Sequence, residues 1–240
     1  MIVFLTSSPC IQGADRALLT PANGFIDRIS AVLPPLPRCL FICSNPHSYD
    51  RTDKFGSDMR SAFSEAGLPF GQFGILDGRY AVEAEALIAA SDFIILAGGH
   101  VPTQNAFFRE IGLAQLLENY RGVIMGISAG SMNAASTVYA QPELEGESID
   151  PAYERYLPGL GLTSVQILPH YQQIKDWTLD GRPLFEDITY ADSIGHCFYA
   201  LVDGSYVYRD DHEQLLIGEA YRIADGQITQ ICTEGQALPI

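Results

Sequence analysis

The sequence is poor in positive charge, and this shortage excludes whole classes of partner. Its 240 residues include 14 Lys and Arg against 29 Asp and Glu, a formal net charge of −15. Binding to nucleic-acid phosphates and docking on anionic membranes both depend on clustered Lys and Arg. We therefore expect neither nucleic acid nor a membrane as a partner.

Cysteine is also scarce, and its pattern indicates neither a disulfide framework nor a metal site. The 5 cysteines are an odd number, and no two of them form a Cys-x-x-Cys pair. This pattern argues against structural disulfides and favours a reducing compartment. Cys43 and His47 have no second pair of ligands to complete a metal site, so we predict no metal.

Long apolar runs and cofactor motifs are missing as well. No stretch reaches the ~18 apolar residues that a membrane span requires. Residues 1–6 are apolar but lack a basic region, so they indicate a first strand and not a signal peptide. We expect a cytoplasmic protein. There is no Gly-x-Gly-x-x-Gly opening a helix and no Walker sequence, so we expect no cofactor.

The first half of the chain alternates short apolar runs with amphipathic segments. Hydrophobic residues make up 47% of the sequence, enough for a large core. Strands are predicted at residues 3–6, 39–43, 73–76, 93–97 and 123–125, and helices at 25–32, 49–66, 82–90 and 104–120. This alternation predicts an α/β fold with a doubly wound, mostly parallel central sheet and helices on both faces.

The second half changes character. A strand is predicted at residues 165–168. Further strands, joined by short turns, are predicted at residues 198–202, 205–208, 214–217, 220–223 and 227–231. They indicate a C-terminal antiparallel meander. Residues 144–161 are predicted to form an acidic loop with one helical turn at 153–156, and residues 185–190 a short helix. Neither a repeat nor a linker divides the chain, so we expect a single domain over residues 1–240.

The strongest chemical motif is Gly-Ile-Ser-Ala-Gly at residues 126–130. It follows a buried strand and precedes small residues with helix potential at 129–136. A sharp strand-to-helix turn of this kind lifts a serine side chain above the sheet, and small flanking residues let the backbone crowd. Ser128 is therefore a candidate nucleophile, and the N–H of Ala129 would point toward a developing oxyanion. A plain glycine-rich helix start is the alternative.

Serine needs a base, and five histidines are available. His170 follows an apolar strand, and the carboxyl ends of parallel strands are where open sheets bind ligands. His47 follows another strand and is a weaker alternative, whereas His196 and His212 suit core and loop positions. After the fourth strand, Gly98 and Gly99 would let an N–H approach a ligand closely. A loop hinge is the other reading of that pair.

Together these segments resemble the aspartyl dipeptidase (dipeptidase E) and cyanophycinase family of serine peptidases, whose fold is related to class I glutamine amidotransferases. Three segments carry the likeness: Leu-Ala-Gly-Gly-His at residues 96–100, Gly-Ile-Ser-Ala-Gly-Ser-Met-Asn at 126–133, and Gly-Leu-Gly-Leu at 159–162 followed by Leu-Pro-His-Tyr at 168–171. Their order and spacing agree with the family over nearly the whole chain.

The resemblance implies a role for each matching residue. Ser128 would be the nucleophile and His170 the general base, with backbone N–H groups of Gly99 and Ala129 in the oxyanion hole. The acidic member would be Asp203, within Ala-Leu-Val-Asp-Gly-Ser at residues 200–205, where the dipeptidases have Glu. An Asp-Gly hairpin turn also explains this segment.

A second departure from the family is histidine at position 100, where asparagine is usual, and we expect His100 to border the substrate site. Tyr171 is a weaker candidate for the same site, and an ordinary surface loop is the alternative for it. The implied reaction is hydrolysis of a short peptide through an acyl-enzyme. A hydrolase acting on other substrates, a cysteine enzyme, or an inactive small-ligand binding protein on the same scaffold are the alternatives. The peptide's identity and the choice between monomer and homodimer stay open.

Overall fold

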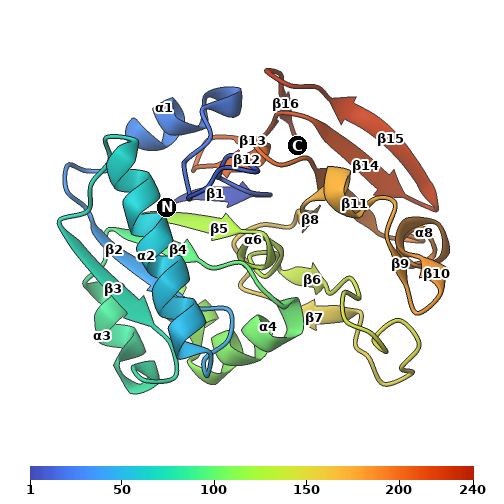
Figure 1. Cartoon of the computed structure of the whole chain (residues 1–240), viewed down its shortest axis with the longest axis horizontal. Coiled ribbons are helices and arrows are strands. Elements are labelled where there is room, and N and C mark those ends of the chain that lie inside the picture. Colours follow the sequence, from blue (N-terminus) through green and yellow to red (C-terminus); the bar gives the residue numbers. More distant parts are fainter.

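The computed structural model describes the whole chain, residues 1–240, and is built around one eight-stranded sheet (Figure 1). Five strands of this sheet are mutually parallel. Their order across the sheet is β1 (Ile2–Thr6), β5 (Val123–Ile127), β4 (Phe93–Leu96), β2 (Arg38–Ile42) and β3 (Gln72–Leu76). Three antiparallel strands extend it beyond β1: β12 (Tyr206–Arg209), β13 (Gln214–Ile217) and β16 (Ala237–Pro239). The predicted α/β class with a mostly parallel sheet is confirmed.

The apolar side chains of each parallel strand pack into two hydrophobic cores, one on each face of the sheet. In β2, Leu40 and Ile42 pack into one hydrophobic cluster, while Cys39 and Phe41 pack into another. The reason is that successive side chains of a strand point to opposite faces. A strand covered on both faces must therefore be apolar throughout, and this explains the continuous apolar runs in the sequence.

Helices cover the two faces as expected. One face carries α1 (Phe25–Ser30) and α2 (Tyr49–Glu65), and the other carries α3 (Ala84–Ala89), α4 (Val101–Glu110) and α5 (Leu113–Leu117) (Figure 1). Short helical turns η1 (Ala22–Gly24) and η2 (Ala81–Glu83) precede α1 and α3.

The single helix predicted over residues 104–120 is wrong, since α4 and α5 are separate. Gly112 lies between them with φ of 65°, a left-handed conformation that breaks the helix and that glycine adopts without a steric penalty. The helical spacing continues across the break because both helices pack against the same face of the sheet.

The C-terminal strands do not form one meander. A second, four-stranded sheet contains β15 (Gln227–Cys232), β14 (Ala220–Ala224), β11 (Cys197–Leu201) and β8 (Gln166–Leu168), in that order. The chain leaves this sheet after β11, joins the large sheet as β12 and β13, and then returns as β14. Antiparallel pairing was predicted correctly for most of these strands, but the sequence pattern did not reveal which sheet each one joins.

The segment between the two sheets is mostly irregular. It contains α6 (Ala129–Met132), the paired strands β6 (Thr137–Tyr139) and β7 (Tyr156–Pro158), α7 (Tyr171–Ile174), and the hairpin of β9 (Thr178–Leu179) with β10 (Arg182–Pro183). A π-helical turn, η3 (Leu184–Thr189), leads into α8 (Tyr190–Asp192). The predicted helical turn at residues 153–156 is absent, because Tyr156 begins β7 and pairs with Tyr139. No helix is both long and apolar enough to cross a lipid bilayer.

The packing predicts which side chains can be replaced by alanine without loss of stability. Ile95, in the middle of β4, is fully buried, so Ile95→Ala should lower the free energy of unfolding by about 2–5 kcal/mol in urea denaturation. Val82 is 97% exposed, so Val82→Ala should change it by less than about 0.5 kcal/mol. Equal losses in the two variants would contradict the assigned core.

Candidate active site

Ser128 lies in a sharp turn between β5 and α6. Its backbone has φ of 49° and ψ of −111°, an unusual conformation for a non-glycine residue. A Cβ on Gly130 would lie 2.3 Å from the Leu96 carbonyl oxygen, and one on Gly126 would lie 2.7 Å from the Ser131 backbone. Both glycines of the motif are therefore needed for the close approach. The following helix, α6, ends at Met132 and is shorter than expected.

His170 and Asp203 meet directly. The distance from His170 Nδ1 to Asp203 Oδ1 is 2.7 Å. Because an ionised carboxylate can only accept, Nδ1 carries the proton and Nε2 is left as the basic nitrogen. His170 follows β8 in a left-handed conformation, with φ of 60°. The shorter side chain of aspartate, compared with the family's glutamate, thus still reaches the imidazole.

Asp203 does not lie in a hairpin turn. It follows β11, and β11 pairs with β8 and β14 but not with β12. The segment around Asp203 is instead the crossing from the small sheet to the large one. The hairpin alternative is therefore wrong, and the turn brings the carboxylate to the boundary between the sheets.

The Asp203 carboxylate is held by several donors. Oδ1 also accepts a hydrogen bond from Ser7 Oγ at 2.6 Å, and Oδ2 accepts from the side-chain amides of Gln172 at 2.7 Å and Gln173 at 2.6 Å. Burial opposes the charged form of Asp203, but the hydrogen bond and charge of His170 and the bonds from Ser7 and Gln172 outweigh it. The pKa of Asp203 consequently lies below its ordinary value.

Ser7 is a residue that the sequence analysis missed. Its hydroxyl donates to Asp203 and accepts the backbone N–H of His170 at 2.7 Å, so it bridges the two residues. It follows β1, which pairs with β5, the strand that ends at Ser128's turn. A serine directly after a central strand was the available signal, but nothing local in the sequence indicated its partners.

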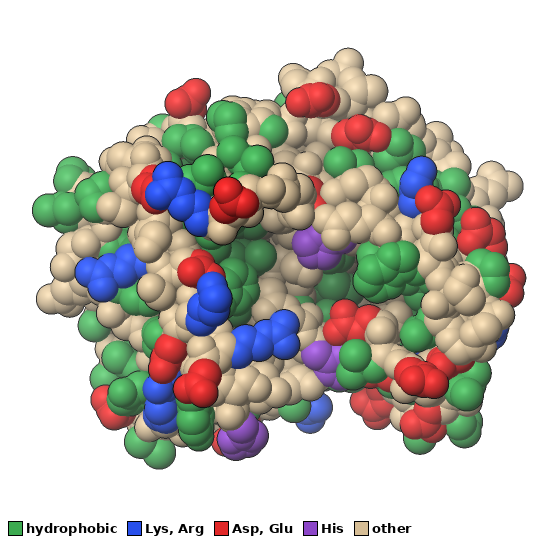
Figure 2. Space-filling model, viewed as in Figure 1, with side chains coloured by type: hydrophobic (Ala, Val, Ile, Leu, Met, Phe, Trp, Pro, Cys, Tyr) green, Lys and Arg blue, Asp and Glu red, His purple; other side chains and the backbone are tan.

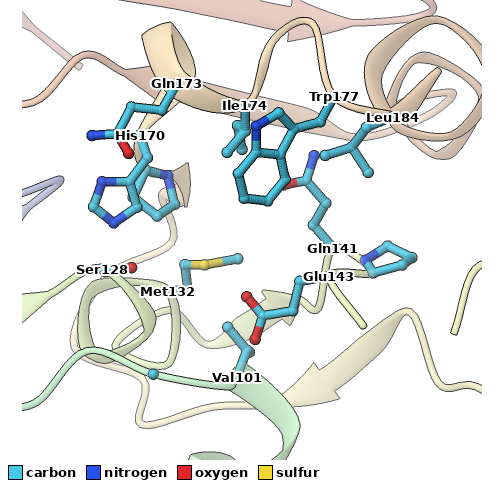
Figure 3. Close-up of a pocket in the computed structure, with 13 residues that line it drawn as sticks. Val101, Ser128, Met132, Gln141, Glu143, His170, Gln173, Ile174, Trp177 and Leu184 are labelled. Atoms are coloured by element: carbon cyan, nitrogen blue, oxygen red, sulfur yellow. The ribbon is translucent and has the colours of Figure 1, made fainter. Parts of the chain in front are cut away.

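Ser128 and His170 line the same small, partly open pocket. Figure 3 shows the serine just below the imidazole ring, and Figure 2 shows a hollow near the middle of this face bordered by histidine, acidic and apolar side chains. The only hydrogen bond of the His170 ring is to Asp203, and no hydrogen bond joins the ring to the Ser128 hydroxyl. Such catalytic contacts often tighten only when substrate binds.

The two expected oxyanion donors lie beside this serine. Gly99 lines the pocket, Ala129 is fully buried, and neither backbone N–H donates a hydrogen bond within the protein. A Cβ on Gly99 would lie 2.3 Å from Ser44 Oγ, so a larger residue does not fit there. Ala129 is buried and Gly99 is half-buried. Unpaired donors in such positions are costly, and a ligand oxygen at this position would satisfy them.

His100 and Tyr171 were expected to border the substrate site, but neither lines this pocket. Both ring nitrogens of His100 are occupied: Nδ1 lies 2.7 Å from Thr103 Oγ1, and Nε2 lies 2.8 Å from Glu147 Oε1. Tyr171 packs its ring against Phe185 and Tyr221. Neither is among the lining residues. Their side chains are committed to other partners, which the sequence did not indicate.

The remaining histidines lie elsewhere. His196 stacks on Tyr156 with 4.2 Å between ring centroids, while His47 and His212 are exposed in turns. No group of three or more His, Cys, Asp and Glu side chains is arranged to hold a metal ion. Of the five histidines, only His170 lines the pocket with Ser128.

The sequence model of peptidase family S51 matches residues 5–217. The chain therefore belongs to peptidase family S51, the dipeptidase E family, and is a serine peptidase by class.

Two solved structures share the fold. A peptidase from an acI-B1 Actinobacterium is 17% identical, with a TM-score of 0.63 over 100% of this chain and 96% of that one. A putative peptidase E protein from Listeria monocytogenes EGD-e is 16% identical, with a TM-score of 0.55 over 96% of this chain and 98% of that one. Among curated proteins, none matches this sequence.

The bonding of Asp203 predicts a pH-dependent stability. Its pKa is depressed in the folded state, so its contribution is present above the unfolded pKa of about 3.9 and is lost as pH falls through the folded value. Asp203→Asn should lower the free energy of unfolding by about 1–3 kcal/mol at pH 7. Urea titrations should show this difference narrowing as the pH falls below about 3.9 and through the lower folded-state pKa.

The matched control is Asp176→Asn, because Asp176 is exposed. It should leave the free energy of unfolding nearly unchanged at either pH. A loss in Asp203→Asn that stays constant between neutral and acid pH would contradict the role assigned to the ionised carboxylate.

Proposed function

We propose that this chain hydrolyses short peptides through a Ser128–His170–Asp203 triad. The observation that carries the proposal is the 2.7 Å contact of His170 with Asp203 at the rim of the pocket that Ser128 also lines. Membership of family S51 supports the same reaction class. The pocket is small and only partly open, so it suits the side chains of a short peptide better than a folded protein.

The residues divide the chemistry among them. His170 Nε2 takes the Ser128 proton as the hydroxyl attacks the peptide carbonyl, and Asp203 stabilises the resulting imidazolium. The N–H groups of Gly99 and Ala129 hold the oxyanion, and one such donor is worth ~3 kcal/mol of barrier. His170 then protonates the leaving amine, and water releases the acyl group from Ser128 by the same steps in reverse.

Ser7 acts in this scheme as a positioning residue. Its hydroxyl binds both the His170 backbone and the Asp203 carboxylate, so it fixes the imidazole relative to its acid. The two glutamines on Oδ2 complete the set of donors around the carboxylate. A carboxylate held this way stays ionised, which is the state that stabilises a cationic imidazole.

Hydrolysis by wild type and Ser128→Ala is the direct test. On a panel of short peptides, the variant should lose roughly 10⁴-fold or more in kcat with an unchanged circular dichroism spectrum, because the nucleophile is gone. Ser136→Ala is the matched control, since Ser136 is exposed and lies outside the pocket, and it should retain full activity.

Other outcomes would favour the alternatives. Hydrolysis of esters but no peptide would favour a non-peptidase hydrolase. Activity that survives serine-directed acylation but is lost to a thiol alkylator would favour a cysteine enzyme. Peptide binding without turnover in the wild type would favour an inactive binding protein on this scaffold. Equal peptide turnover by wild type and Ser128→Ala would remove Ser128 from the mechanism.

A further inference from the structure

The pocket beside Ser128 has an unbalanced charge. None of its 13 lining residues is Lys or Arg, and Glu143 is the one acidic side chain among them. Much of the rest of the lining is apolar, contributed by Val101, Met132, Ile174, Trp177 and Leu184. An acidic substrate side chain entering this space would therefore meet a carboxylate and no cation.

The Glu143 carboxylate has no partner in the protein. Its backbone N–H is hydrogen-bonded, but its side-chain oxygens make no hydrogen bond or ion pair. Figure 3 shows the carboxylate on one side of the pocket and the Trp177 indole on the opposite side. Although Glu143 is an exposed residue, partial loss of hydration at the pocket raises the pKa of its carboxyl; Glu147 adds to this, whereas His100 and His170 oppose it. A bound cation would offset that loss of hydration.

The segment that carries Glu143 is fixed at several points. Glu147 Oε2 accepts the backbone N–H groups of Glu143 at 2.9 Å and Leu144 at 3.0 Å, while its Oε1 contacts His100. Farther along, Asp180 accepts the backbone N–H of Gly146 at 2.7 Å. These hydrogen bonds fix the backbone that carries the Glu143 carboxylate. Selective recognition of a ligand group requires a fixed backbone of this kind.

We propose, on the basis of the proposed function, that this pocket selects peptides with a cationic group beside an apolar side chain, and that Glu143 is the residue that determines this specificity. The cation would lie between the Glu143 carboxylate and the Trp177 ring, an arrangement that combines an ion pair with a cation–π contact. The apolar side chain would pack on Met132, Ile174 and Leu184. Peptides with an acidic residue in this pocket are disfavoured by repulsion from Glu143.

The cationic group has two possible sources, the peptide's own amino terminus and a Lys or Arg side chain. A matched substrate series distinguishes them: Leu-Leu, N-acetyl-Leu-Leu, N-acetyl-Lys-Leu and Asp-Leu. If the amino terminus is bound, acetylation of Leu-Leu should raise KM about tenfold or more. If a side chain is bound, N-acetyl-Lys-Leu should have a lower KM than N-acetyl-Leu-Leu. Either result supports the proposal.

The variant that tests the specificity residue is Glu143→Gln. It should raise KM for the preferred cationic peptide about tenfold or more with little change in kcat, because a charge-assisted contact is lost while the triad is intact. Glu145→Gln is the matched control, since Glu145 is exposed like Glu143 but does not line the pocket. A preference of the wild type for Asp-Leu, or an unchanged KM in Glu143→Gln, would overturn the proposal.

Binding to Ser128→Ala separates this proposal from the proposed function. Calorimetric titration of this variant with the same peptides needs no turnover, and the added Glu143→Gln substitution should weaken binding of the cationic peptide about tenfold or more. If the wild type hydrolyses none of the peptides but this charge preference holds, the hydrolytic function fails and the specificity stands. If hydrolysis depends on Ser128 but binding shows no charge preference, the specificity fails alone.

Discussion

The hydrogen bond between His170 and Asp203 is the interaction on which the account of this site depends. His170 follows β8 and Asp203 follows β11, neighbouring strands of the small sheet, whereas Ser128 follows β5 in the large sheet. The pocket therefore lies where the two sheets meet. Ser7, at the end of β1, fastens the two sheets at this point by bonding to His170 and Asp203. Geometry set by four strand ends is more rigid than geometry set by loops alone.

Two of the six non-glycine residues with positive φ lie at the same place. Ser128 and His170 both have positive φ, at 49° and 60°, conformations that cost free energy for residues other than glycine. The tight packing of Gly126 and Gly130 and the bonds around Asp203 compensate for that cost. The same fixed backbone leaves the N–H groups of Gly99 and Ala129 without partners. A pocket that is strained and incompletely bonded before a ligand arrives is suited to stabilising charge that develops during a reaction.

The sequence predicted the local features well and the long-range ones poorly. The turn at Ser128 was predictable because its requirements, a buried strand and small neighbours, lie within residues 123–130. The five parallel strands were predictable from their apolar runs. The division of the C-terminal strands between two sheets was not, since pairing partners lie far apart in sequence and Asp203-Gly204 looks like an ordinary hairpin turn. The side-chain partners of Ser7, Tyr171 and His100 lie far away in the sequence, and no short motif specifies such contacts.

The most direct test of the central claim is the rate at which a fluorophosphonate modifies Ser128, followed by intact mass and peptide mapping in wild type and His170→Ala. This reagent reacts with activated serines and needs no knowledge of the natural peptide. We predict a single adduct on Ser128 in the wild type and a rate of modification lower by roughly 10³-fold or more in His170→Ala. Equal rates in the two proteins, or an adduct on another residue, would contradict the convergence of these side chains into one catalytic unit.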